Sequence, residues 1–148
     1  MAFLQRTVTC GELRPEHAGQ TVILNGWVHS RRDLGGMAFV DIRDRYGITQ
    51  FVVEPTVHAD VAALARELRS EFVVAVKGTV RMRQNPNPNM PTGLIEVVAD
   101  ELQILNRAEL PPFDIGDEGN LNEERRLKDR YLDLRRPLMQ RIFIVRHK

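Results

Sequence analysis

Cysteine is almost absent from this 148-residue chain: Cys10 is its one thiol, so no disulfide can form within the chain. The four histidines, His17, His29, His58 and His147, are too far apart in sequence for the spacing of a zinc site. These absences exclude a disulfide scaffold and argue against a structural metal. We therefore expect a cytoplasmic protein in a reducing compartment.

Long apolar runs are also missing. Residues 1–10 contain Arg6 and no continuous apolar stretch, and no later segment has the length needed to cross a bilayer. The sequence therefore predicts neither a secretory signal nor a membrane partner. The composition, 43% hydrophobic and 28% charged, is that of a globular protein with one core and a short appendage.

Charge of one sign is not in excess, because the formal net charge is only +1. A polyanionic partner must therefore be argued from where cations cluster. Catalytic motifs are lacking as well, since the chain has neither a glycine-rich phosphate loop with its lysine nor a serine nucleophile elbow. We expect no catalytic residue and no cofactor in this chain, which should act as a binder.

What the sequence does contain is a series of β-strand patterns. Strands are predicted at 21–31, 37–44, 48–53, 72–83 and, in two closely spaced pieces, 94–98 and 102–105. Loops are predicted at 33–36, 45–47 and the proline-rich segment 84–93. Gly26 and Gly78 lie inside the two long strands and are predicted to bend or bulge them.

One amphipathic helix is predicted at residues 57–69, with Thr56 as its N-cap. The resulting order of three strands, a helix and two strands is that of an OB-fold, a small barrel that binds oligonucleotides. The predicted fold class is therefore all-β with one helix: a five-stranded OB-fold β-barrel, followed by a hinge and the start of a helical segment.

The composition changes near residue 109. Residues 110–122 hold prolines and glycines among acidic residues, as in a hinge between domains. A helix is predicted to begin near Glu123 and to continue until Pro137 breaks or kinks it, and the apolar run 142–145 begins a further element. The predicted domains are an OB-fold domain at 1–108 and a hinge with a linker helix at 109–148.

Oligonucleotide-binding barrels combine cations that follow the backbone with an aromatic ring on which a base stacks. Alternation in the second strand places Phe39 on the face opposite Ala38 and Val40, among charged residues. We therefore predict that its ring is a stacking platform rather than part of the core. Six arginines next to the predicted loops are expected to converge on one face: Arg31, Arg32, Arg43, Arg45, Arg81 and Arg83.

Two further polar side chains leave alternatives open. Gln50 lies on the opposite face from Phe51, and its amide is either a surface group or the source of the acceptor and donors that a base edge needs. Glu96 points away from Ile95 and Val97. Its carboxylate either accepts from a base or, as the pattern alone favours, is only solvated.

Three sequence blocks resemble the N-terminal region of bacterial aspartyl-tRNA synthetases. They are GWVHSRRDLGG at 26–36 with FVDIRD at 39–44 and GITQ at 47–50, then TGLIEV at 92–97, then RLKDRYLDLRRP at 126–137. The blocks stand in the family's order and together span nearly the whole chain. The resemblance implies an anticodon-binding domain for the tRNA of aspartate.

The same resemblance implies a role for individual residues. Phe39 matches the ring that stacks on the middle anticodon uracil, and Gln50 matches the amide that hydrogen-bonds this base. Arg32 matches an arginine at the anticodon.

The resemblance also implies roles for five further residues. Glu96 matches the carboxylate near the first, guanine-type base, and Arg81 and Arg83 fall where basic residues approach the loop backbone. Leu34 and Pro86 lie in loops that help to decide whether the tRNA of asparagine is also accepted. Leu34 resembles the restrictive form, but the proline-rich loop leaves this question open.

In the family, a class II catalytic domain follows the matched residues, and it activates aspartate with ATP and magnesium before attaching it to tRNA. The resemblance therefore implies that this chain alone does not aminoacylate and is monomeric, whereas the full-length enzyme is a homodimer. Two alternatives remain open. One is the anticodon domain of an asparaginyl- or lysyl-tRNA synthetase, and the other is a freestanding OB-fold binder of single-stranded nucleic acid.

Overall fold

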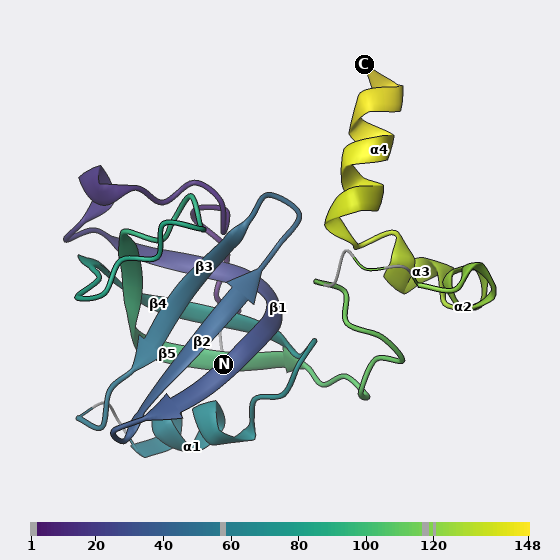
Figure 1. Ribbon diagram of the computed structural model, residues 1–148. Coiled ribbons are helices and arrows are strands. Elements are labelled where there is room, and N and C mark those ends of the chain that lie inside the picture. The colour runs from purple at the N-terminus through teal and green to yellow at the C-terminus, as the bar shows by residue number, and fades with distance from the viewer. Residues whose placement is uncertain (1–2, 57–58, 117–118, 120) are drawn as a thin grey trace. The chain divides into compact units, whose positions relative to one another are not determined.

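A computed structural model of the chain describes residues 3–56, 59–116, 119 and 121–148. Five strands form a closed barrel in the order β1-β2-β3-β5-β4 (Figure 1). Their bounds are β1 Thr21–Leu34, β2 Met37–Arg43, β3 Ile48–Val53, β4 Val73–Met82 and β5 Ile95–Asn106. Neighbouring strands are antiparallel except β3 and β5, which pair in parallel. The predicted five-stranded barrel is therefore confirmed.

The hydrophobic core fills the inside of the barrel, where each strand contributes alternate apolar side chains. On β2 these are Ala38, Val40 and Ile42, which are all buried, as alternation predicts. Phe51 of β3 is fully buried beside them. A short 3₁₀ turn, Pro15–His17, precedes β1.

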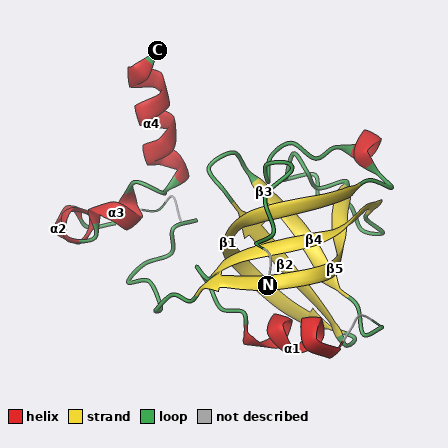
Figure 2. Cartoon of the chain, turned by 180° about the vertical axis from the view of Figure 1, so that it is seen from behind, coloured by secondary structure: helices red, strands yellow, loops and turns green. Residues whose placement is uncertain are grey.

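Helix α1, Ala59–Glu67, lies across one end of the barrel (Figure 2) and packs its apolar side into the same core. It is shorter than the predicted range 57–69, and Leu68 remains buried although it lies beyond the helix. Val57, the first residue of the predicted helix, lies outside the described residues. The predicted strand pieces 94–98 and 102–105 form one continuous strand, β5.

Strand β1 is longer than predicted, because Asp33 and Leu34 belong to it and pair with β2. The connection is Gly35 and Gly36 alone, with φ angles of 59° and 82°. A two-residue turn with both φ values positive is type I′, whose twist matches antiparallel strands and which favours glycine. The predicted loop 33–36 is therefore wrong in its first half, and Leu34 stands at the tip of a hairpin.

The register of β1 against β2 shifts between Val28 and Ser30. Before this shift, the even-numbered residues Leu24 and Val28 face the core. Beyond it, the even-numbered Arg32 lies opposite Phe39 on the outside of the barrel. An extra residue in one strand inverts which positions face inward, and that inversion sets the face on which Arg32 stands.

The glycines inside the long strands are required by close backbone packing. An added Cβ at Gly26 would lie 2.4 Å from the carbonyl oxygen of Arg43, and one at Gly78 would lie 2.0 Å from that of Val98. Gly78 adjoins a register shift between β4 and β5, as predicted for a bulge. The irregularity of β1 falls beyond Gly26 rather than at it.

The chain divides into two compact units, Met1–Leu110 and Pro111–Lys148. The second unit contains α2 Glu123–Lys128, α3 Arg130–Asp133 and α4 Pro137–His147. The single helix predicted from Glu123 is wrong, because the helix is interrupted at Asp129. Pro137 begins a helix instead of ending one, since proline fits the first helical turn, where no amide donor is needed.

A buried carboxylate organises the second unit. Asp133 is fully buried and accepts hydrogen bonds from Arg126 Nε at 3.2 Å, Arg130 Nη1 at 2.8 Å and Arg136 Nη1 at 3.2 Å. Burial raises the pKa of Asp133, but the hydrogen bonds from Arg126 and Arg136 outweigh it and hold the pKa below its usual value. The ionised carboxylate therefore joins α2, α3 and the start of α4.

Candidate nucleic-acid interface

A cavity of about 510 Å³ opens on the outer surface of the barrel, bounded by the β1–β2 hairpin and the loop between β4 and β5. Its lining is Arg32, Asp33, Leu34, Met37, Phe39, Gln50, Glu54, Arg81, Arg83, Gln84, Asn85 and Glu96. All six residues predicted to bind an anticodon thus line one cavity, together with Leu34. Pro86, the other predicted discrimination residue, is exposed in the neighbouring loop and does not line it.

Phe39 lies on the outer face of β2, as alternation predicts. Its neighbours Ala38 and Val40 are buried in the core, whereas Phe39 is only partly buried. It stands directly opposite Arg32 of β1 and Val52 of β3. A partly exposed ring in a cavity that also holds arginines is a suitable surface for stacking a base.

Gln50 is not a solvated surface amide, because only 2% of it is exposed. Its Oε1 accepts from Arg83 Nη2 at 2.8 Å and from Arg32 Nη2 at 3.1 Å, and its Nε2 donates to Glu96 Oε2 at 3.0 Å. The amide thus ties three of the predicted residues together. One hydrogen of Nε2 remains beyond these bonds.

The solvated reading of Glu96 is wrong, because this residue is only 5% exposed. Its Oε1 accepts from Arg81 Nε at 2.8 Å, directly across the β4–β5 ladder, while Oε2 accepts from Gln50. Alternation correctly places Glu96 outside the barrel. It cannot reveal that side chains of neighbouring strands cover the carboxylate there.

Glu54, which the sequence analysis missed, also lines the cavity. It directly follows β3, four residues after Gln50, so alternation extended past the strand end would have placed both on one face. Its Oε1 accepts from Arg81 Nη1 at 2.5 Å. Burial lowers the pKa of Arg81, but hydrogen bonds to Glu96 and Glu54 outweigh it and raise the pKa. Arg81 is therefore a charged guanidinium held between two carboxylates.

Arg83 keeps one donor without a partner. Its Nη2 donates to Gln50, while Nη1 is buried and has no hydrogen-bond partner among the described residues. A buried donor left unpaired is unfavourable. An acceptor oxygen of a base or phosphate at this point would satisfy it.

The predicted convergence of six arginines is half right, because Arg31, Arg43 and Arg45 do not line the cavity. Arg31 pairs with Asp33 at 2.6 Å and donates to the carbonyl oxygen of Arg66 at 2.8 Å. Arg43 is buried, and its Nη2 contacts both carboxylate oxygens of Glu71 at 2.9 and 3.0 Å. Arg31 and Arg43 are thus held by partners outside the cavity, and Arg45 lies in the turn between β2 and β3.

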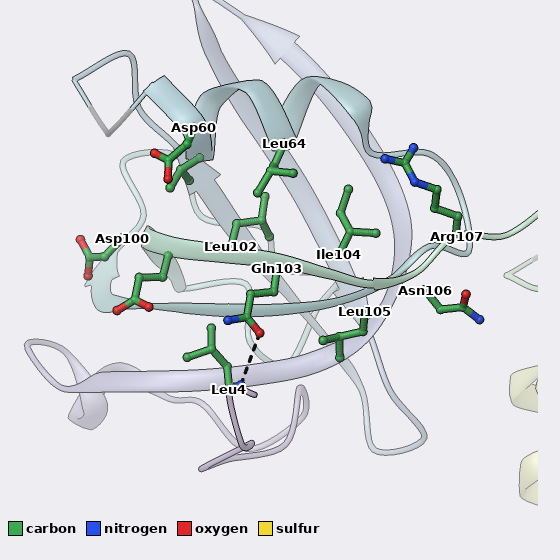
Figure 3. Close-up of a pocket in the computed structure, with 12 residues that line it drawn as sticks. Leu4, Asp60, Leu64, Asp100, Leu102, Gln103, Ile104, Leu105, Asn106 and Arg107 are labelled. Carbon is green, nitrogen blue, oxygen red and sulfur yellow. Dashed lines mark hydrogen bonds between the residues drawn. The ribbon is translucent and has the colours of Figure 1, made fainter. Parts of the chain in front are cut away.

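A larger cavity, of about 1020 Å³, lies along β5 and beside α1 (Figure 3). The carboxylates of Asp60, Asp100 and Glu101 line it together with Arg107. Arg107 is already paired with Glu67 at 2.5 Å. The larger cavity has three carboxylates and one arginine, whereas the smaller cavity has three carboxylates and three arginines. The smaller cavity is therefore the better candidate for nucleic acid.

Neither a metal-binding cluster nor a membrane-spanning helix is found among residues 3–56, 59–116, 119 and 121–148. Within these ranges, no three or more histidine, cysteine or carboxylate side chains are grouped to hold a metal ion. No helix in the same ranges is both long and apolar enough to cross a bilayer.

Comparison with known proteins places residues 22–105 in the family described as "OB-fold nucleic acid binding domain", tRNA_anti-codon. The chain is 55% identical over 146 residues to an aspartate–tRNA(Asp/Asn) ligase of Acidobacterium capsulatum, a match covering 97% of this chain and 24% of that protein. It is 49% identical over 147 residues to an aspartate–tRNA ligase of Geobacillus kaustophilus, covering 98% and 25%. The chain thus spans about a quarter of the length of the curated relatives it matches.

Solved structures of tRNA synthetases share the fold of this chain. Asparaginyl-tRNA synthetase from Pyrococcus horikoshii is similar with a TM-score of 0.72 and 30% identity, over 90% of this chain and 30% of that one. Aspartyl-tRNA synthetase from Entamoeba histolytica shares the fold with a TM-score of 0.83 at 21% identity, over 96% and 35%.

Proposed function

Because the chain belongs to the family of OB-fold nucleic acid binding domains, we propose that its barrel binds the anticodon loop of a transfer RNA. The observation that carries the proposal is the single cavity that gathers Phe39, three arginines and the Gln50–Glu96 pair. A stacking ring beside cations and hydrogen-bonding groups is the combination by which OB-folds hold unpaired nucleotides.

In this proposal, the middle base of the anticodon stacks on Phe39. Uracil presents two carbonyl oxygens, and the buried Nη1 of Arg83 and the second hydrogen of Gln50 Nε2 are donors that these oxygens would accept from. Glu96 provides an acceptor for the amino and imino groups of a guanine at the first position. Arg32 and Arg81 provide charge for the backbone.

We further propose that the cognate tRNA is that of aspartate. The relative at 55% identity is named as an aspartate–tRNA(Asp/Asn) ligase and the one at 49% as an aspartate–tRNA ligase, whereas the asparaginyl-tRNA synthetase from Pyrococcus horikoshii is 30% identical. Leu34, which is 69% exposed and lines the cavity, is proposed to help decide whether the tRNA of asparagine is also accepted. Pro86 is proposed to act through the shape of its loop.

We also propose that the chain serves as the anticodon-binding part of an aspartate–tRNA ligase. In such an enzyme, a catalytic part uses ATP and magnesium to activate aspartate and transfer it to tRNA. This proposal draws on the relatives, of whose length the chain spans about a quarter.

The test compares stem-loops that carry the anticodons of aspartate, asparagine and lysine, which share a middle uracil, together with an aspartate loop carrying cytosine there. Dissociation constants are measured by filter binding at fixed salt, because affinity for RNA depends steeply on ionic strength. We expect the aspartate loop to bind tightest and the cytosine variant to bind more weakly. Equal binding of all four loops and of unstructured RNA would instead identify a general binder of single strands.

A further inference from the structure

The carboxylate of Glu54 accepts a hydrogen bond from the guanidinium of Arg81. We propose that Glu54 acts as a built-in competitor for a phosphate of the bound RNA: it holds Arg81 in the free protein and gives it up when the backbone arrives. This inference rests on the proposed function, and it assigns to Glu54 a role that neither the sequence pattern nor the resemblance indicates.

Arg81 contacts two carboxylates that differ in how firmly they are held. Its Nε is 2.8 Å from Glu96, whose side chain is 6% exposed and also accepts from Gln50. Its Nη1 is 2.5 Å from Glu54, whose side chain is 32% exposed. Glu96 is therefore a fixed part of the sheet surface, whereas Glu54 stands at the cavity margin just beyond the end of β3.

The guanidinium itself is within reach of a ligand, because 39% of the Arg81 side chain is exposed. An ion pair with this much exposure is weak, since water screens it and both side chains lose freedom in forming it. A phosphate can take the place of Glu54 on the outer nitrogens of Arg81 while Nε stays on Glu96. Arginine suits this exchange because its planar donors accept bidentate oxygens.

The carboxylates in the cavity offset the positive charge of its arginines, and this is how Glu54 lowers the affinity for RNA. Arg32, Arg81 and Arg83 line the cavity, but so do the carboxylates of Asp33, Glu54 and Glu96. The free protein therefore offers little net attraction to a polyanion, in line with the low net charge of the chain. RNA gains the charge of Arg81 only if it places a phosphate where Glu54 stands.

The test is Glu54→Gln, which keeps the size of the side chain and removes its charge. We expect the aspartate stem-loop to bind about two- to fivefold tighter, the range that a weak, partly exposed ion pair allows. The slope of log affinity against log salt should stay close to that of the wild type, because one phosphate contacts Arg81 in both complexes. In an Arg81→Met background, Glu54→Gln should no longer raise the affinity for the stem-loop.

Glu101→Gln is the matched control. Glu101 also joins a cation across β4 and β5, at 2.5 Å from Lys77 with both side chains exposed, but it does not line this cavity. Glu101→Gln changes the net charge by the same amount but outside this cavity, so it should leave the affinity for the stem-loop close to that of the wild type. An equal effect of both substitutions would overturn the proposal in favour of a general charge effect.

Two other results separate a failure of the competitor role of Glu54 from a failure of the proposed anticodon binding. Weaker binding by Glu54→Gln, with an unchanged thermal midpoint, would show that Glu54 positions Arg81 for RNA, and would overturn its role as a competitor. Binding of the wild-type chain to the aspartate loop and to a scrambled loop is measured in the same experiment. If the wild-type chain binds both loops equally, the proposed function is wrong, whatever the effect of Glu54→Gln.

Discussion

Replacing Phe39 with alanine is expected to weaken binding of the aspartate stem-loop by about 1 to 3 kcal/mol, the usual contribution of one base stacked on an aromatic ring. That loss is a rise in Kd of roughly fivefold to 150-fold. The fold should be largely preserved, because Phe39 lies on the outer face of β2 and is only partly buried. Filter binding and denaturant unfolding of the same preparations measure the two effects.

Two variants serve as controls for this prediction. Phe39→Leu keeps most of the apolar surface without the ring and should bind as weakly as Phe39→Ala, whereas Phe39→Trp should retain affinity. Phe51→Ala, in the fully buried core position, should lower the free energy of unfolding by about 3 to 5 kcal/mol. If Phe39→Leu bound like the wild type, or if Phe39→Ala destabilised the protein as much as Phe51→Ala, the ring would be a packing residue.

Three other predictions test separate parts of the structure. Gln50→Ala should narrow the preference for a middle uracil over cytosine by about 1 to 3 kcal/mol, and equal weakening of both loops would show that the amide only positions its neighbours. Glu71→Ala should cost about 3 to 5 kcal/mol of stability in urea, because it leaves the buried Arg43 without its carboxylate, and Arg43→Met with Glu71→Leu should cost less. The pKa of Asp133 is depressed in the folded state, so its stabilising effect is present above its ordinary pKa and is lost as the pH falls through the folded value. Hydrogen-exchange protection of α3 and α4 should therefore decrease as the pH drops below about 4, and an Asp133→Asn variant should be poorly protected already at pH 6.

The sequence correctly predicted those features of the barrel that depend only on residues next to one another in a strand. Alternation on β2 depends only on side chains pointing to opposite faces, so it correctly separated Phe39 from Ala38 and Val40. It also placed Glu96 correctly outside the barrel. The helix in the second unit was predicted less well, since Pro137 can either end a helix or begin one, and periodicity does not distinguish the two.

Burial of the polar residues was not predictable in the same way. Gln50 and Glu96 come from β3 and β5, and they bury one another only because the barrel brings these strands together. Glu54 was missed because it lies one residue beyond the end of β3, although alternation continued past that end places it on the same face as Gln50. Its partner Arg81 is 27 residues away in sequence.

The sequence by itself determined the barrel, the outward direction of Phe39 and the resemblance that assigns six residues to one task, because these depend on local alternation and on motifs. The tertiary structure alone decided which arginines share the cavity. The register shift between Val28 and Ser30 sends Arg32 outward, beside Phe39, and leaves Arg31 to pair with Asp33. A one-residue shift exchanges the two faces of a strand, and its position depends on the pairing of β1 with β2, which no pattern within β1 records.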